Sequence, residues 1–115
     1  MTEIYMTGLE FAAWRNLIGL NFAEIAEIFG VAEKTVRNWE SDRAPVPFGI
    51  AEEIMSLAKV HEEYAEALAK KERVITVSRD KSDFQGGRGR GWYVAALSRA
   101  LTINPDLMAE WDYDN

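Results

Sequence analysis

The outward side of one short predicted helix carries four polar residues: Glu33, Lys34, Arg37 and Asn38. Side chains of these types donate and accept hydrogen bonds at the edges of base pairs in the major groove of DNA. The inward side of the same helix is apolar, with Val36 and Trp39. The chemistry these residues suggest is recognition of a duplex, and the surrounding chain must hold the helix in place.

This helix is predicted to be the second of a pair between Gly19 and Pro47. Ala26 is a small residue where two helices would cross, Gly30 supplies a backbone free to turn, and Val36 is a β-branched plug. The spacing is typical of a helix-turn-helix, which presents one helix to the major groove. An ordinary helical bundle with a glycine turn is the plainer alternative, and the full set of residues favours the helix-turn-helix.

Composition excludes several classes of function. The chain has 115 residues, of which 48% are hydrophobic, so a buried core is expected. Without cysteine there is no disulfide framework, thiolate metal site or cysteine nucleophile, and the single histidine, His61, cannot build a metal cluster alone. Neither a Ser-His-Asp spacing nor a phosphate-binding loop is evident. We therefore expect no enzyme, no catalytic residue, no metal and no cofactor.

Charge and hydropathy limit the compartment and the partners. No apolar run approaches the roughly 20 residues of a membrane helix, and the start lacks the pattern of a signal peptide. We expect no membrane partner and a place in the bacterial cytoplasm, at the nucleoid. The net charge of −6 argues against a general polyanion binder. However, Lys34, Arg37 and Arg43 cluster in or just after the outward-facing helix, and phosphate affinity depends on where cations lie.

Local signals divide the first half of the chain into three helices. The first begins at Thr7 and Gly8 and ends at Gly19. Asn21 is expected to cap the second helix, and Gly30 to turn with positive φ. The third helix runs from Ala32 or Glu33 to about residue 41. Two prolines after this helix make residues 44–47 an extended connector.

The second half reads as a long helix over residues 48–72, a strand over 73–78 and a polar, glycine-rich loop over 80–91. A helix follows from Trp92, and an Asn-Pro-Asp cap at 104–106 starts a last short helix to about Trp111. The expected fold is mainly α. A helix-turn-helix DNA-binding domain occupies residues 1–57, and a dimerisation region occupies 58–115, with helix 48–72 shared, strand 73–78, loop 80–91 and helix 92–111.

The long helix predicts a homodimer. Its apolar residues recur in alternating steps of four and three, a seam that continues past the length needed to cover a small head. A two-fold pair would read both halves of an inverted repeat. The expected interface consists of Leu57, His61, Tyr64, Leu68, Val74, Ile75, Val77 and Trp92. On such a seam, His61 is more often a packed or hydrogen-bonded residue than a pH sensor.

The residues from about Leu9 to Leu57 resemble the lambda-repressor-like (XRE/Cro) family of DNA-binding domains. The resemblance is carried by an arginine in the first helix, a Gly-Leu-polar cap and a Trp-Glu followed by a basic loop: Arg15, Gly19-Leu20-Asn21 and Trp39-Glu40-Ser41-Asp42-Arg43. It implies a structural ion pair between Arg15 and Glu40. The family often has glutamine at the first position of the second helix, where this chain has Phe22, so a usual polar contact is lost.

The same resemblance implies a DNA-contacting set of nine residues: Asn21, Phe22, Ala32, Glu33, Lys34, Thr35, Arg37, Asn38 and Arg43. Lys34 and Arg37 would donate to guanine, and Asn38 would pair with adenine. Glu33 would accept from cytosine. Thr35, Arg43 and the helix start at Asn21 would contact phosphates. Phe22 either packs against a sugar or completes the core.

The whole layout also resembles the YdiL-like proteins and related phage anti-CRISPR-associated repressors. FAAWRNLIGL, NWESDRAPVP and GWYVAALSRAL carry this likeness. It implies a dimeric autoregulator that represses its own operon. We expect a sequence-specific repressor whose partners are double-stranded DNA with an inverted repeat and a second copy of itself.

Two alternatives stay open: an antitoxin that masks a toxin, and an interaction protein that inhibits a host factor. Either would add a protein partner. A further question concerns residues 86–91, GGRGRG, which read either as an RGG-like nucleic-acid segment with Trp92 free to stack on a base, or as a flexible linker. One short copy favours the linker.

Overall fold

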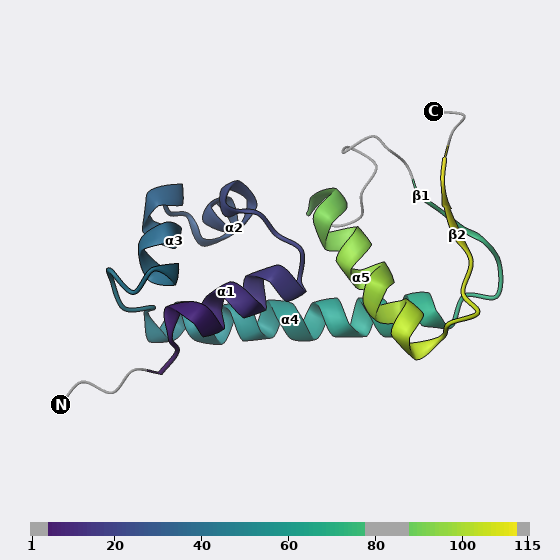
Figure 1. The fold of residues 1–115 in the computed structure, drawn as a ribbon, viewed down its shortest axis with the longest axis horizontal. Coiled ribbons are helices and arrows are strands. Elements are labelled where there is room, and N and C mark those ends of the chain that lie inside the picture. Colours follow the sequence, from purple (N-terminus) through teal and green to yellow (C-terminus); the bar gives the residue numbers. More distant parts are fainter. Residues whose placement is uncertain (1–4, 78–87, 113–115) are drawn as a thin grey trace. The chain divides into compact units, whose positions relative to one another are not determined.

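The computed structural model describes residues 5–77 and 88–112. They form five helices and a pair of short strands (Figure 1), so the described chain is mainly helical, as predicted. The chain divides into two compact units, residues 1–59 and 60–115, and a single long helix carries residues of both. None of the described helices combines the length and apolar character that crossing a membrane requires.

The first unit contains α1 (Gly8–Leu17), α2 (Phe22–Phe29), α3 (Glu33–Glu40) and the beginning of α4 (Phe48–Ala69). Local chemistry fixes the helix ends. Thr7 caps α1 and Asn21 caps α2, each in a capping box with the glutamate three residues on. Gly30 ends α2 at φ 67°, which confirms the predicted left-handed turn.

An apolar core fills the space between these helices. Phe11 of α1, Ile25 of α2 and Val36 of α3 are each fully buried. The rings of Phe11 and Trp39 meet edge to face, with centroids 5.7 Å apart. Gly8 lies so close to the end of α3 that a Cβ there would collide with the carbonyl oxygens of Trp39 and Glu40. A glycine is therefore needed for α1 to start at this point.

The second unit contains the end of α4, β1 (Ile75–Val77), α5 (Gly89–Ile103) and β2 (Ala109–Trp111). The two strands pair in parallel, with Ile75 opposite Ala109 and Val77 opposite Trp111. The buried cluster of this unit is rich in alanine: Ala65, Leu68, Ala69, Ile75, Val77, Ala96, Ala100 and Leu107. Small side chains at these positions allow the helices to approach closely.

Three expectations about the second half need correction. Residues 109–111 are a strand and not part of a terminal helix, because β1 needs a neighbour for its backbone N–H and C=O groups. The Ile75 N–H donates to the Met108 carbonyl at 2.9 Å, and the Asp112 N–H donates to the Val77 carbonyl at 2.7 Å. The second correction concerns the bounds of the long helix and the strand. The helix ends at Ala69 rather than residue 72, and the strand begins at Ile75 rather than residue 73, while residue 78 lies outside the described part of the chain.

The predicted loop over residues 80–91 is the third correction. Residues 80–87 lie outside the described part of the chain, and Gly89–Gly91 already form the first turn of α5. Gly89 has φ 88°, a value that glycine adopts without steric cost. The helix predicted from Trp92 therefore begins three residues earlier and continues to Ile103.

Candidate nucleic-acid interface

The outward side of α3 is open to solvent. Glu33, Lys34 and Arg37 are exposed, and the Arg37 side chain retains 58% of its accessible surface. The inward side is closed, because Val36 is fully buried and Trp39 is 5% exposed. The helix thus presents polar and charged groups on one side while the other side completes the core.

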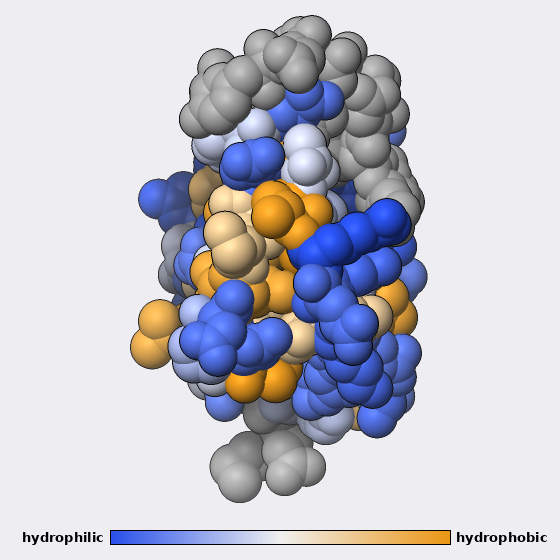
Figure 2. All heavy atoms as spheres, turned by 90° about the vertical axis from the view of Figure 1, so that its right-hand side faces the viewer, coloured by the Kyte–Doolittle hydropathy of each residue, from blue (hydrophilic) through white to orange (hydrophobic). Residues whose placement is uncertain are grey.

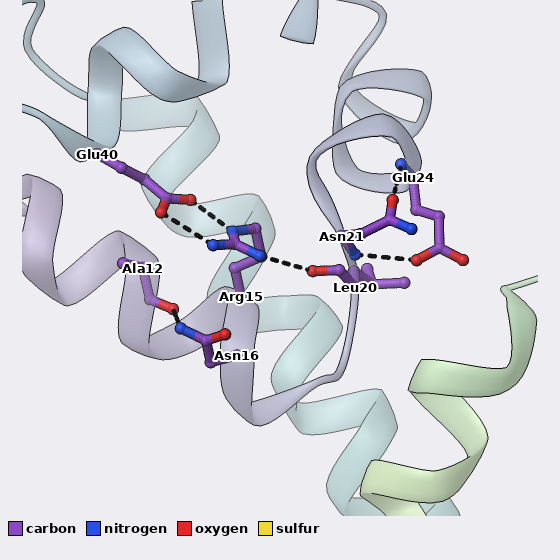
Figure 3. A network of polar contacts seen from close by, with 7 residues as sticks. All are labelled: Ala12, Arg15, Asn16, Leu20, Asn21, Glu24 and Glu40. Atoms are coloured by element: carbon purple, nitrogen blue, oxygen red, sulfur yellow. Dashed lines mark hydrogen bonds and ion pairs between the residues drawn. The ribbon is translucent and has the colours of Figure 1, made fainter.

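A charge-assisted clamp fixes the end of α3 against α1 (Figure 3). The Arg15 guanidinium donates to both carboxylate oxygens of Glu40, from Nε at 2.5 Å and from Nη2 at 3.1 Å. It also donates from Nη1 to the Leu20 carbonyl at 3.0 Å. The side chains of Arg15 and Glu40 are only 13% and 12% exposed. These contacts confirm the ion pair implied by the resemblance, and they assign Arg15 a structural role.

The start of α2 is occupied by its own cap. The Asn21 side-chain oxygen accepts from the Glu24 N–H at 2.8 Å, and the Asn21 N–H donates to the Glu24 carboxylate at 2.9 Å (Figure 3). The carboxylate adds negative charge at the helix start, which opposes an approaching phosphate. A phosphate contact at Asn21 stays a prediction, and in this geometry it is weaker than those on α3.

Phe22, the first residue of α2, is half-buried and contacts two arginines. The Arg15 Cζ lies 4.2 Å from the centroid of its ring, and the Arg37 Cζ lies 4.7 Å from it. Both distances fall within the range of a cation–π contact. Of the two alternatives for Phe22, the structure favours a packing role, although the ring covers a guanidinium of the outward-facing helix in addition to the core.

The turn after α3 sets the position of Arg43. Asp42 adopts φ 64°, and its side-chain oxygen accepts from the Gly8 N–H at 2.9 Å. The N–H groups of Arg43 and Ala44 both donate to the Asn38 carbonyl, at 2.9 and 3.1 Å. These bonds fix the backbone beside Arg43, whose side chain is exposed. A fixed backbone with an exposed cation suits contact with a phosphate.

The remaining residues predicted to contact DNA differ in their exposure to solvent. Ala32 is the exposed N-cap residue of α3, without a side-chain cap hydrogen bond. Thr35 and Asn38 are half-buried at the edges of the outward side. Glu33 lies one turn before Arg37, with its carboxylate 3.9 Å from the guanidinium. The predicted set therefore gathers on α3, the start of α2 and the turn that follows α3.

Of the residues predicted for the dimer interface, Leu57 lies in the first unit and the others lie in the second. Five of the eight residues are buried there: His61, Leu68, Ile75, Val77 and Trp92. Tyr64 and Leu57 are half-buried, and Val74 is 42% exposed. Within the second unit, α5 and the strand pair supply apolar partners for the end of α4. A dimer interface at these residues stays a prediction.

His61 is fully buried and hydrogen-bonded at both ring nitrogens. Its Nδ1 lies 3.1 Å from the Arg99 guanidinium, which can only donate, so Nδ1 accepts. Nε2 then carries the proton and donates to the Trp92 carbonyl at 3.0 Å. Burial lowers the pKa of His61, and the nearby Arg99 charge lowers that pKa further, against the opposing effect of the Trp92 carbonyl. The ring is neutral and structural.

The second unit also carries apolar side chains at its surface. Figure 2 shows apolar residues gathered in the middle of the face it presents, with polar residues beside them. A shallow hollow in this unit is lined by Val77, Val94, Leu97, Ala109, Glu110 and Trp111. Leu101 and Ile103 of α5 are 38% and 57% exposed, and Met108 is 65% exposed. Of these residues only Val77 belongs to the predicted interface, because the prediction drew mainly on the apolar face of the long helix.

Comparison with known proteins gives one informative relative. No protein-family model matches the chain. A repressor of Pectobacterium phage ZF40, named the Aca2 repressor, is 37% identical to it over 102 residues. The match covers 88% of this chain and 78% of the relative. The match therefore includes most of each of the two units.

Proposed function

We propose, from the premise that the chain belongs to the family of the Aca2 repressor, that it is a DNA-binding transcriptional repressor. In this proposal it binds an inverted-repeat operator near its own promoter as a homodimer and excludes polymerase sterically. It acts in the bacterial cytoplasm, on the nucleoid, without a cofactor. The relative is named as a repressor and comes from a phage, in line with the resemblance of the whole layout to phage repressors.

The observation that carries the proposal is the outward side of α3. Exposed Lys34 and Arg37 supply donors for guanine, while a buried inner side and the Arg15–Glu40 clamp hold the helix rigid. A rigid helix that presents exposed donors suits base reading, because little conformational entropy is lost on binding. Arg43 adds a phosphate contact at the end of the same helix.

The homodimer follows from the size of the reading surface. One short helix reads only a few base pairs, so a two-fold pair is needed to reach the specificity of an operator. Exposed apolar side chains of the second unit, among them Val94 and Leu101, offer a surface for a second copy. We therefore propose an interface on the outside of α5 rather than on the seam of α4.

Footprinting on the DNA that flanks the chain's own gene tests the proposal. We expect a protected inverted repeat with half-sites about one helical turn apart. Arg37→Ala should cost about 1–3 kcal/mol and relax the base preference at one position. Arg43→Ala should weaken binding to all sequences alike and reduce the salt slope by about one.

The matched control is Lys59→Ala, which removes an exposed cation of α4 from the same unit. It should leave the footprint and the base preference unchanged. If the full chain protects no duplex at low salt, the proposal is wrong. If Lys34→Ala and Arg37→Ala bind as the wild type does, α3 is not the reading helix, and an interaction protein that keeps the first unit as a scaffold becomes the better description.

A further inference from the structure

We propose that Phe22 is a positioning residue for base recognition: its ring orients the Arg37 guanidinium and so sets the base preference at the position that Arg37 reads. The inference rests on the proposed function and adds a residue that base-edge chemistry alone would not select, since a phenyl ring donates and accepts no conventional hydrogen bond. The geometry that points to it is the shared contact of Arg15 and Arg37 with one ring.

The first step is the rigidity of Arg15. Its guanidinium donates to Glu40 through two nitrogens and to the Leu20 carbonyl through the third, so every nitrogen of the group is held (Figure 3). The side chain is 13% exposed. A guanidinium fixed in this way is a stationary surface on which an aromatic ring can pack. Phe22 packs there, with its centroid 4.2 Å from the Arg15 Cζ.

The second step extends this order to the outward side of α3. The Arg37 Cζ lies 4.7 Å from the same centroid, although the Arg37 side chain is 58% exposed. The Glu33 carboxylate, 3.9 Å away, is a second restraint on the same group. An exposed arginine without such contacts samples many rotamers, which it must give up when it binds a base. The ring of Phe22 therefore pre-orders a side chain that would otherwise be free.

The charges around the ring are balanced pair by pair. Two guanidinium groups near one ring repel each other, but each has its own carboxylate: Glu40 for Arg15 and Glu33 for Arg37. The ring contributes the negative potential of its π-system to both cations. Removal of the ring would leave the Arg15 clamp intact and release only Arg37. This separation makes the positioning role testable apart from the stability of the unit.

The test compares Phe22→Leu with Phe22→Tyr in the full chain. Leucine keeps an apolar side chain and loses the ring, whereas tyrosine keeps the ring. Each protein selects duplexes from a randomised pool, and the base position that Arg37 reads is identified as the one whose preference Arg37→Ala abolishes. We expect Phe22→Leu to lower the preference at that position by about two- to fivefold. Phe22→Tyr should retain it.

A double-mutant cycle separates positioning from a general effect. If Phe22 acts through Arg37, the variant with both Phe22→Leu and Arg37→Ala should bind as Arg37→Ala alone does. The same cycle with Arg43→Ala is the control, and there the two effects should multiply. A merely structural Phe22 would weaken all duplexes alike, lower the unfolding midpoint and leave the base preference in place. That result would overturn the proposal.

A second substitution guards against misfolding. Phe22→Met also removes the ring, and its flexible side chain fills irregular space. If Phe22→Leu does not fold, Phe22→Met gives the same comparison, and an unchanged preference at the Arg37 position would overturn the proposal. If the wild-type chain selects no duplex at all, the proposed function fails rather than the role of Phe22. The two failures are therefore distinguishable.

Discussion

The two units treat two of their polar sites differently. In the first unit Lys34 and Arg37 are exposed on α3 above the partly buried Arg15–Glu40 clamp, whereas in the second unit His61 is fully buried. The clamp leaves Lys34 and Arg37 exposed on a rigid helix. Both ring nitrogens of His61, by contrast, form hydrogen bonds within the second unit, to the Trp92 carbonyl and the Arg99 guanidinium. The contrast teaches that helical periodicity can serve different ends. On its open side α3 displays donors and acceptors, whereas on its apolar side α4 buries one polar residue, His61.

The largest expected effect comes from Leu68→Asp. Leu68 is 4% exposed in the core of the second unit, so an aspartate there is a buried charge without a partner. We expect a loss of about 3–5 kcal/mol in the free energy of unfolding. Urea denaturation followed by tryptophan fluorescence measures it.

The matched control for that change is Val94→Asp, at a side chain 39% exposed on α5. It should change the unfolding free energy little, within about 0.5 kcal/mol. Under the homodimer proposal it should also lower the dimer fraction in light scattering. A stable, folded, monomeric Leu68→Asp protein would break the comparison, since Leu68 would then face a second chain.

Glu40→Gln tests the clamp of the first unit. The substitution removes the charge that holds Arg15 at two nitrogens, in a site where the Glu40 side chain is 12% exposed. Hydrogen bonds to charged groups contribute about 1.5–3 kcal/mol, and we expect a loss of unfolding free energy in that range. Glu33→Gln, which removes an exposed pair on α3, should cost no more than about 0.5 kcal/mol. Equal losses would show that the buried clamp has no special role.

Gly8→Ala tests the close approach of α1 to the end of α3. An added Cβ meets the carbonyl oxygens of Trp39 and Glu40, and these are backbone atoms that cannot rotate away. We expect a loss of about 1–3 kcal/mol in thermal unfolding. The control is Gly49→Ala in α4, where a Cβ has no neighbour within 4 Å. That change should stabilise by about 0.4–1 kcal/mol.

The smallest expected effect is the pH dependence that His61 gives to the second unit. Its pKa in the folded chain lies below the ordinary histidine value of 6.5, chiefly through burial. The unfolded chain therefore binds more protons between the folded pKa and 6.5, and stability rises with pH in that window. The contribution is complete above 6.5 and falls as pH drops below it.

Unfolding midpoints of the wild type and His61→Gln at several pH values check this expectation. The difference between the two proteins should shrink as pH falls below 6.5, because only the wild type has the titrating ring. The carboxylates titrate equally in both proteins and cancel in the comparison. A difference that is constant with pH would mean that the ring stays accessible to protons in the folded chain.

Much of the first unit could be predicted because its signals are local. The caps at Thr7 and Asn21 and the positive φ at Gly30 each depend on residues within one turn of the helix end. The fold class and the Arg15–Glu40 pair were also predicted correctly, the pair through the family resemblance. The base contacts of α3 stay predictions, since DNA is needed to test them.

The second unit was harder because its structure depends on distant partners. Residues 109–111 form a strand because β1 lies beside them, and nothing in the sequence of those residues alone predicts this pairing. Likewise, the seam of α4 is apolar whether α5 or a second chain covers it, so periodicity cannot decide between them. The contacts of Phe22 could not be predicted from the sequence for a similar reason: its two arginine partners come from α1 and α3, far apart along the chain.

The parallel pairing of β1 with β2 has a consequence for the order in which the protein is made. Parallel neighbours cannot be joined by a tight hairpin, so β1 leaves the ribosome long before the segment that completes its ladder. The first unit can acquire its structure during synthesis, whereas β1 must wait with open backbone groups until Ala109–Trp111 has emerged. A nascent chain halted before that point would expose an unfinished edge to chaperones and proteases.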